Sequence, residues 1–199
     1  MTGLRFVEAE NHFEAQAVQD GVSQASGALK TVAVSLMNMA NNIRWLASGP
    51  RCGLGEIILP ANEPGSSIMP GKVNPVIPES LLQICAQVIG NDTTIMLSGQ
   101  GGVFELNTMM PVIAYNLIQS IQLLALGVRS LAGKCITGIV ANPETCAAYV
   151  DKSLAIATYL VPALGYDRAA AVSKKAHQSG RSIREIVLEE GLMPGEAFD

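Results

Sequence analysis

The chain has 199 residues, of which 49% are apolar, 15% charged and 5% aromatic. Disordered chains are poor in apolar residues and rich in net charge, so this composition excludes disorder and predicts a buried core. The net charge is −4, from 13 basic and 17 acidic residues. That balance excludes a basic nucleic-acid footprint and a polybasic membrane patch. So few charges also predict that partner chains cover part of an apolar surface.

The cysteines and histidines predict neither a metal site nor a cofactor. No two cysteines form a CxxC pair, and His12 and His177 stand alone in the sequence. Zinc sites need several such ligands at short spacing, so we expect buried, reduced thiols in a cytoplasmic protein. The first residues also lack the apolar segment of a secretory signal.

The apolar spacing predicts three long helices, over residues 12–48, 78–98 and 109–131. The first carries at helical spacing Phe13, Leu29, Val32, Leu36, Met39, Ile43 and Leu46. On the second we expect an apolar face of Leu82, Cys85, Val88 and Ile89 opposite a polar face of Gln83, Gln87, Asn91 and Thr94. A 37-residue helix spans about 55 Å, whereas a compact globule of this length is roughly 40 Å across. The sequence therefore predicts an all-α fold built on an elongated helix bundle.

The third predicted helix lies in a stretch without charge, residues 106–128. Asn116, Gln119 and Ser120 form one stripe along it, whereas a membrane span needs a nearly unbroken apolar run. We expect a buried helix surrounded by helices of other subunits, and hence an obligate oligomer.

Charge density divides the chain near residue 142. Residues 1–141 hold 16 charged residues, and the 58 residues of 142–199 hold 14. We expect residues 1–141 to form part of a central bundle and 142–199 a small helical C-terminal domain, truncated at its end. Predicted caps in the second part are Asn142, Asp167 with Gly180 as the helix end, and Ser182 with Glu185 before Gly191.

A long loop, residues 49–78, separates the first two predicted helices. Ser66, Ser67, Lys72 and Asn74 lie close together in it. Such residues suit a small anionic substrate: Lys72 supplies a positive charge, and the glycines at 65 and 71 let backbone N–H groups point inward as an anion nest. A solvated surface loop would use the same residue types for turns. Residue types alone do not decide between these two interpretations.

One motif does decide. The segment Gly65–Pro75, GSSIMPGKVNP, resembles the signature of the fumarase/aspartase superfamily, whose members release fumarate by cleaving C–O or C–N bonds. Around it, PRCGLGEIILPANEPGSS, IGND and FELN resemble class II fumarase, while NPVIPE and IGNDTT also resemble aspartate ammonia-lyase. The resemblance covers essentially the whole chain and corresponds to the C-terminal half of a subunit.

The resemblance implies roles for six residues. Ser66 corresponds to the general base, which takes a proton from the carbon next to a carboxylate. Ser67 and the segment Lys72, Val73 and Asn74 correspond to ligands of the substrate carboxylates. Glu79 corresponds to a glutamate that orients a histidine of another chain. Outside that family context, Ser66 would be a turn serine and Glu79 a carboxylate that complements the helix dipole.

The implied activity is reversible hydration of fumarate to (S)-malate through an aci-carboxylate. The family builds each site from three chains of a homotetramer, and this sequence holds one of the three segments. Neither His12 nor His177 occupies the family's histidine position, so we expect the 199-residue chain to be inactive alone. Two alternatives stay open: aspartate ammonia-lyase, and a non-catalytic helical scaffold that assembles without turning over substrate.

Overall fold

The computed structural model describes residues 3–195, which divide into two compact units. The first unit takes the described residues up to Gly53 together with Ile58–Val140, and the second takes Leu54–Ile57 and the described residues from Ala141 onward. Both units are helical, and every strand among the described residues is two residues long. The predicted all-α fold is thereby confirmed.

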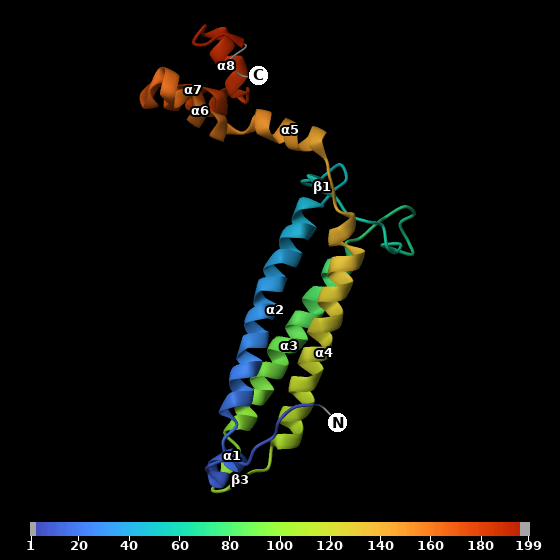
Figure 1. Ribbon diagram of the computed structural model, residues 1–199. Helices are drawn as coiled ribbons and strands as arrows, with labels where there is room; N and C mark the ends of the chain where they lie inside the picture. Colours follow the sequence, from blue (N-terminus) through green and yellow to red (C-terminus); the bar gives the residue numbers. More distant parts are fainter. Residues whose placement is uncertain (1–2, 196–199) are drawn as a thin grey trace. The chain divides into compact units, whose positions relative to one another are not determined.

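Three long helices form the body of the first unit: α2 (Asp20–Leu46), α3 (Val76–Gly99) and α4 (Met110–Lys134). In Figure 1, α3 lies between α2 and α4 and packs against both of them. The predicted second and third helices are thus present, each slightly longer than expected. The short elements of this unit are α1 (His12–Ala17), β2 (Gly102–Val103), β3 (Leu106–Asn107) and η1 (Ile136–Gly138). Strands β1 (Ile57–Ile58) and β4 (Val140–Ala141) lie where the chain passes from one unit to the other.

The turn between α3 and α4 is built from a two-stranded hairpin. Strand β2 pairs antiparallel with β3, with Gly102 opposite Asn107. The Asn107 side chain is fully buried; its amide donates to the Ser98 carbonyl (3.2 Å) and its oxygen accepts from the Met109 N–H (2.8 Å). The Asn107 side chain therefore bonds to the last turn of α3 and to the residue that precedes α4.

The predicted first helix is wrong as one continuous element. Val18 adopts an extended conformation (φ −99°, ψ 129°), which ends α1 and separates it from α2. Helix α2 has 27 residues and spans about 40 Å, so a 55 Å rod is not what makes the bundle elongated. The bundle is elongated because three helices of 24 to 27 residues lie side by side.

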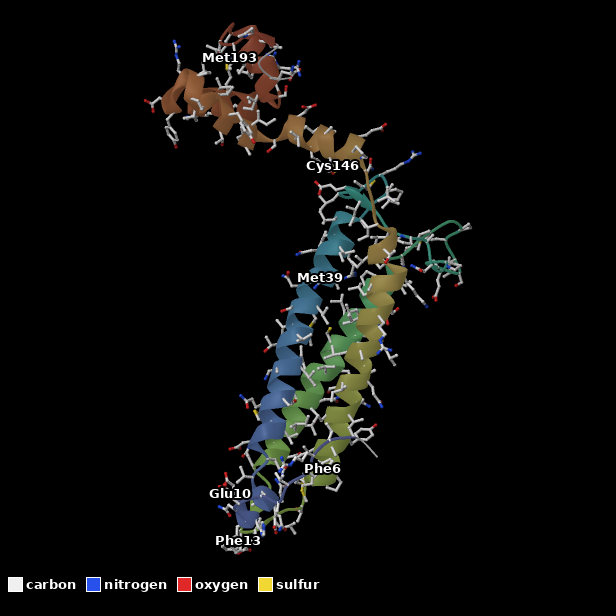
Figure 2. The ribbon with its side chains drawn as sticks, viewed as in Figure 1. Phe6, Glu10, Phe13, Met39, Cys146 and Met193 are labelled. Carbon is white, nitrogen blue, oxygen red and sulfur yellow. The ribbon has the colours of Figure 1, made fainter. Side chains whose placement is uncertain are left out.

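The buried face of α2 also differs from the prediction. Its buried residues are Ser26, Ala33, Ala40 and Ile43. Ile43 is buried as predicted, whereas Met39 (Figure 2) and Val32 are exposed. Phe13, which lies in α1, is exposed as well. Small residues seven apart let α3 approach closely, whereas larger side chains on the neighbouring positions face outward.

Polar side chains take part in the packing of α3 against α4, contrary to the expected polar face. Asn91 is 2% exposed, and its amide donates to Ser120 Oγ (3.0 Å) and Gln119 Oε1 (2.9 Å). Its oxygen accepts from the Gln87 amide (2.8 Å). The stripe of Asn116 and Ser120 therefore faces α3, on the same buried face of α4 as Leu124 and Leu131.

Helix α4 and the residues that follow it are the one segment of the described chain long and apolar enough to cross a membrane, over Met110–Gly138. About a quarter of the tested window is buried (28%). Asn116 and Ser120 of this helix hydrogen-bond to Asn91 of α3. Such contacts are typical of a helix that packs in a bundle.

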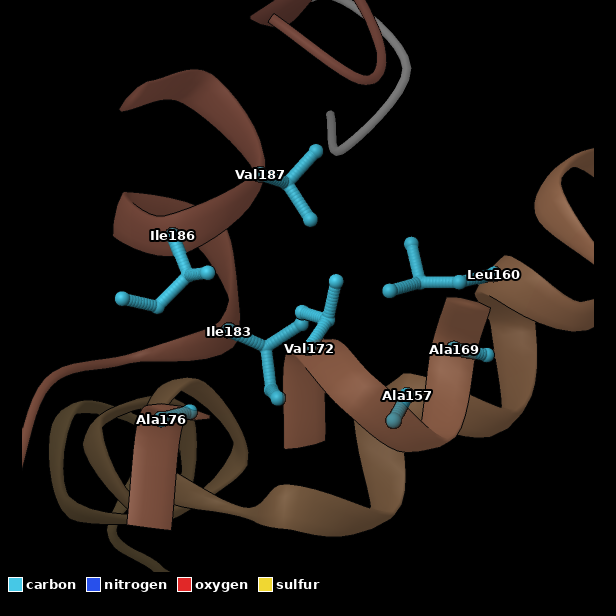
Figure 3. Packing of buried hydrophobic residues seen from close by; sticks show 8 residues of the cluster. All are labelled: Ala157, Leu160, Ala169, Val172, Ala176, Ile183, Ile186 and Val187. Atoms are coloured by element: carbon cyan, nitrogen blue, oxygen red, sulfur yellow. The ribbon is translucent and has the colours of Figure 1, made fainter. Parts of the chain in front are cut away.

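The second unit consists of α5 (Pro143–Lys152), η2 (Leu154–Ile156), α6 (Ala157–Leu164), α7 (Tyr166–Ser179) and α8 (Ile183–Glu189). Figure 3 shows its core, to which α6, α7 and α8 contribute Leu160, Val172, Ile183, Ile186 and Val187 among others. Helix ends in this unit follow the predicted caps in most cases. Asn142 caps α5, Gly180 ends α7 in the left-handed region (φ 67°), and Ser182 with Glu185 forms a capping box.

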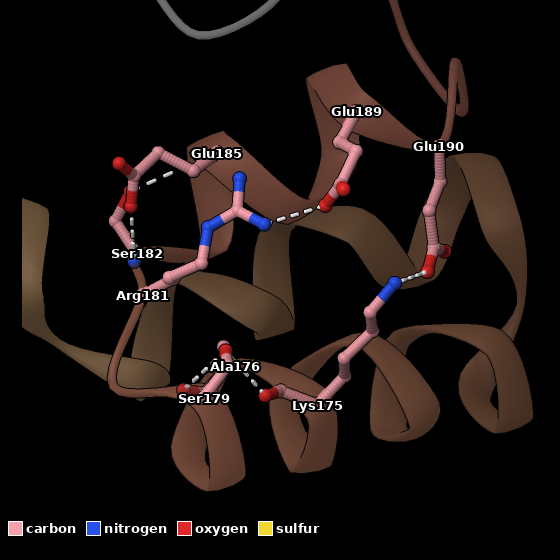
Figure 4. Close-up of polar contacts among 8 residues, drawn as sticks. All are labelled: Lys175, Ala176, Ser179, Arg181, Ser182, Glu185, Glu189 and Glu190. Carbon is pink, nitrogen blue, oxygen red and sulfur yellow. Dashed lines mark hydrogen bonds and ion pairs between the residues drawn. The ribbon is translucent and has the colours of Figure 1, made fainter.

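One predicted cap is wrong. Asp167 lies in the first turn of α7, and Gly165 occupies the cap position. Figure 4 shows the Ser182–Glu185 box beside the ion pairs Arg181–Glu189 and Lys175–Glu190, both 2.6 Å. The end predicted for this domain lies at residues 196–199, outside the described residues.

Candidate active site

The loop that contains the GSS motif closes on itself. Pro64 forms an antiparallel bridge with Val73, and the Gly65 N–H donates to the Lys72 carbonyl (2.7 Å). The Asn74 amide donates back to the Gly65 carbonyl (3.0 Å). These contacts join the two ends of residues 65–74, and we call this closed segment the ring. We call the residues that lead into it, 60–64, the stem. A side chain at position 65 would place its Cβ 2.6 Å from the Asn74 nitrogen, so only glycine fits there.

Inside the ring, Ser66 receives two backbone hydrogen bonds. Its Oγ accepts from the N–H of Ile68 (3.1 Å) and from the N–H of Met69 (3.2 Å). Two N–H donors on a hydroxyl oxygen favour its deprotonated form, since hydrogen bonds to a charged form stabilise that form. The same two contacts are those of a serine turn, so they suit a serine base and also the turn interpretation.

The ring borders an open hollow of about 360 Å³. Ser66, Lys72 and Val73 line it, together with Asn62 and Glu63 from the preceding stem. The Lys72 side chain is exposed and makes no ion pair among the described residues. The structure thus brings three of the six predicted site residues to one hollow and adds Asn62 and Glu63, which the sequence did not single out.

The other three predicted residues lie beside the hollow rather than in its lining. Ser67 is exposed on the ring, and the Asn74 amide is engaged by the Gly65 carbonyl. Glu79 lies in the first turn of α3. The predicted anion nest is wrong at Gly65, because closing the ring uses that N–H for the Lys72 carbonyl.

The partner of Glu79 is an arginine that sequence reasoning missed. Arg44 Nη2 lies 3.4 Å from Glu79 Oε1, and Arg44 Nη1 donates to Asn41 Oδ1 (3.2 Å). Arg44 Nε is buried and has no hydrogen-bond partner within the described chain. A sequence signal existed: α2 carries only three charged residues in 27, and Arg44 lies in its last turn, next to the loop.

No cluster of three or more His, Cys, Asp or Glu side chains suited to a metal occurs within residues 3–195. Cys85 and Cys135 are buried, and burial raises the pKa of both thiols, so they stay protonated at neutral pH. Cys146 is half-buried, while Cys52 is exposed, so the expectation of burial is wrong for Cys52.

Comparisons with known proteins show what the chain is similar to. Residues 1–90 match a family described as "Lyase", and residues 156–199 match "Fumarase C C-terminus". The whole chain is 52% identical to the fumarate hydratase class II of Thermosynechococcus vestitus, of which it covers 43%. The resemblance to the fumarase/aspartase superfamily is confirmed.

Two further relatives of this superfamily extend the comparison. The chain is 52% identical over 198 residues to fumarate hydratase 1, mitochondrial, of Arabidopsis thaliana, and covers 40% of it. The crystal structure of class II fumarase from Schistosoma mansoni superposes with a TM-score of 0.88 at 45% identity, over 98% of this chain and 40% of the fumarase. The chain therefore spans about two fifths of the length of the fumarases that it matches.

Proposed function

We propose that the protein to which this chain belongs is a lyase that reversibly hydrates fumarate to (S)-malate. The observation that carries the proposal is Ser66, whose Oγ accepts two backbone N–H groups at the edge of a hollow that Lys72 also lines. A proton acceptor and a cation at one opening suit a dicarboxylate. The identity of 52% over this chain, which spans 43% of the Thermosynechococcus vestitus fumarate hydratase, supports the same substrate.

In the dehydration direction, Ser66 takes the proton from the carbon next to a carboxylate of malate. The electron pair left behind places a second negative charge on that carboxylate, as an aci-carboxylate, and hydroxide then leaves from the neighbouring carbon. Preorganised donors and a cation aimed at the developing charge give the largest stabilisation available. We assign this task to Lys72, Ser67, Val73 and Asn74.

Glu79 has a different task in the proposal. Its Oε1 faces Arg44, which leaves Oε2 for a histidine contributed by another chain. The site would then be assembled from several subunits, as the resemblance implies, and we propose a homotetramer. Exposed apolar residues on α4, such as Tyr115, Ile118 and Leu126, support an assembly that covers this helix. We place the enzyme in the cytoplasm, although the name of the Arabidopsis relative shows that such enzymes also work in mitochondria.

The second candidate activity is release of fumarate and ammonia from aspartate. Residues 74–79 and 89–94 favour it, because they also resemble aspartate ammonia-lyase. A chimera separates the two: the chain replaces its matched region in the Thermosynechococcus vestitus enzyme, and fumarate formation is followed with malate and with aspartate. We expect turnover of malate alone. Turnover of aspartate at a comparable rate would overturn the assignment as a fumarate hydratase.

A further inference from the structure

The stem of the site loop is attached to the C-terminal end of α4. Asn62 lies in this stem, four residues before Ser66, and its amide group makes two hydrogen bonds to carbonyl groups. Asn62 Nδ2 donates to the carbonyl of Pro60 (3.1 Å) and to the carbonyl of Lys134 (3.0 Å). Lys134 is the last residue of α4, where carbonyl groups have no partner within the helix. One side chain thus joins the loop to a helix end 72 residues away.

A close backbone approach supports the same attachment. A Cβ built on Gly138, in the η1 turn that follows α4, would lie 2.5 Å from Pro60 Cγ. Real Cβ atoms do not come that close, so the stem contacts the turn only because position 138 is glycine. By contrast, a Cβ on Gly133, one turn earlier, would meet nothing within 4 Å.

The stem, the end of the ring and the start of α3 also meet beside Cys135. Pro60 and Asn62 of the stem, Asn74 of the ring and Pro78 of α3 border a space of only about 10 Å³ together with Cys135. Cys135 itself is 1% exposed. The stem is therefore packed close to the residue that follows α4, while the ring is held together by its own hydrogen bonds.

We propose that Asn62 is a positioning residue: its amide fixes the ring that carries Ser66 and Lys72 to the end of α4. The ring is closed at its neck by Gly65 and Asn74, so it moves as a unit, and its orientation depends on the stem. Removing the Asn62 donor frees the stem without breaking the ring. The importance of this attachment for catalysis rests on the proposed function, whereas the attachment itself does not.

How often the loop opens can be measured on the 199-residue chain, without substrate, from the rate of cleavage by trypsin. Lys72 is exposed, and its N–H and carbonyl are both used inside the ring, so trypsin cleaves after Lys72 only when the loop opens. In Asn62→Asp the side chain keeps its shape but loses the donor and faces two carbonyl oxygens. We expect cleavage after Lys72 to become about tenfold faster, the scale of losing two hydrogen bonds. Gly138→Ala should act in the same direction because it displaces Pro60.

Matched controls separate loop attachment from general destabilisation. Gly133→Ala changes α4 without touching the stem, and Asn42→Ala removes an exposed asparagine that contacts only Asn38 within the described chain. Both should leave the cleavage rate within twofold of the parent chain. Equal rates in Asn62→Asp and the parent chain would overturn the proposal. So would an acceleration in Gly133→Ala as large as in Gly138→Ala.

A second measurement keeps this proposal apart from the proposed function. In the chimera, Asn62→Asp should lower kcat by about tenfold at unchanged thermal midpoint, since the ring is less often in place. If the chimera turns over neither malate nor aspartate, the proposed function fails while the cleavage result stands. If cleavage accelerates but kcat stays at the parent value, Asn62 is not a positioning residue for the reaction.

Discussion

At the scale of single residues, the chemistry of the site depends on what surrounds Ser66. A free serine hydroxyl is a very weak acid, so its use as a base requires an environment that stabilises the alkoxide. The N–H groups of Ile68 and Met69 supply two donors, and the ring that Gly65 and Asn74 close holds them in place. The proposed role of Ser66 as a base therefore rests on its residue type and on the local backbone geometry together.

This view predicts the effect of removing the hydroxyl. In the chimera, Ser66→Ala should lower kcat by at least 10²-fold, the usual scale for a positioned acid–base group, with KM little changed. The matched control is Ser179→Ala, an exposed serine at the end of α7, which should leave both parameters unaltered. Near-normal turnover in Ser66→Ala would assign the base to another group.

Lys72 should behave differently from Ser66. Lys72→Ala removes a charge that holds a carboxylate in the ground state and in the transition state alike, so we expect KM to rise as kcat falls. Steady-state kinetics of the chimera with malate measure both. A fall in kcat at constant KM would mean that Lys72 does not bind the substrate carboxylate.

The sequence predicted the residues of the loop better than their contacts. A motif of eleven residues makes Ser66 and Lys72 candidates because their types and spacing are visible in one segment. The donors of Ser66 are backbone groups, and no residue type reports which carbonyl or hydroxyl a backbone N–H will find. For the same reason, the sequence did not predict that the Gly65 N–H bonds to the Lys72 carbonyl. It did not predict the contact between Arg44 and Glu79 either, because the two residues lie 35 positions apart.

At the scale of elements, α2 and α3 are joined by a buried carboxylate. Asp92 is 7% exposed and accepts from Ser26 Oγ (2.7 Å) and Lys30 Nζ (2.5 Å). Burial raises the pKa of Asp92, but the hydrogen bonds from Lys30 and Ser26 outweigh it and leave the pKa below its usual value. A lowered pKa stabilises the folded chain above the unfolded-state pKa, and this contribution is lost as pH falls through the folded-state pKa.

We therefore predict a pH-dependent cost for Asp92→Asn. At pH 7 the variant should lose about 1–2 kcal/mol of unfolding free energy, because a charged hydrogen bond is lost and Lys30 is partly screened by solvent. The difference should begin to shrink below the unfolded-state value of 3.8, where the unfolded chain takes up a proton at Asp92. It should be small once the pH falls below the lowered folded-state pKa, where the native carboxyl is protonated as well. Urea unfolding at pH 7 and in acid measures the difference in unfolding free energy between the variant and the parent chain. An equal difference at pH 7 and in acid would contradict the linkage.

The polar contacts between α3 and α4 give a second prediction at this scale. Asn91→Ala removes the partner of Gln87, Gln119 and Ser120 and leaves the buried Ser120 hydroxyl with fewer partners. We expect a loss of roughly 1–3 kcal/mol in urea unfolding. Thr93→Ala, an exposed neighbour on α3, serves as the control and should cost less than 0.5 kcal/mol, roughly the range of surface substitutions.

Helix positions were predictable where local signals act, and helix faces were not. Asn142 and Ser182 were found because capping is decided by a few adjacent residues. Asn91 was expected on the polar face since it follows Gln83 and Gln87, yet its partners on α4 make its burial favourable. Likewise, Ala33 and Ala40 enter the core of the bundle because close helix approach favours small residues over the larger Val32 and Met39.

At the scale of the whole molecule, the outward face of α4 predicts assembly. Tyr115, Ile118 and Leu126 are each more than half exposed in the single chain. Burying such a face stabilises contacts between copies by about 25 cal/mol per Å² of apolar surface. Light scattering should give a mass of two or four chains of 20.9 kDa, and Ile118→Glu should lower it. A folded monomer at micromolar concentration would contradict the proposed assembly.

The most direct test of the account is the formation and consumption of fumarate, followed by its absorbance. The chain alone should show no turnover at high concentration, because the loop, even with the proposed base and carboxylate ligands, does not enclose the substrate. The chimera with the Thermosynechococcus vestitus enzyme should interconvert malate and fumarate, and the same chimera with Ser66→Ala should be at least 10²-fold slower. Robust turnover by the chain alone, or a folded chimera that is silent toward malate and fumarate, would contradict the assignment of this loop to fumarate hydration.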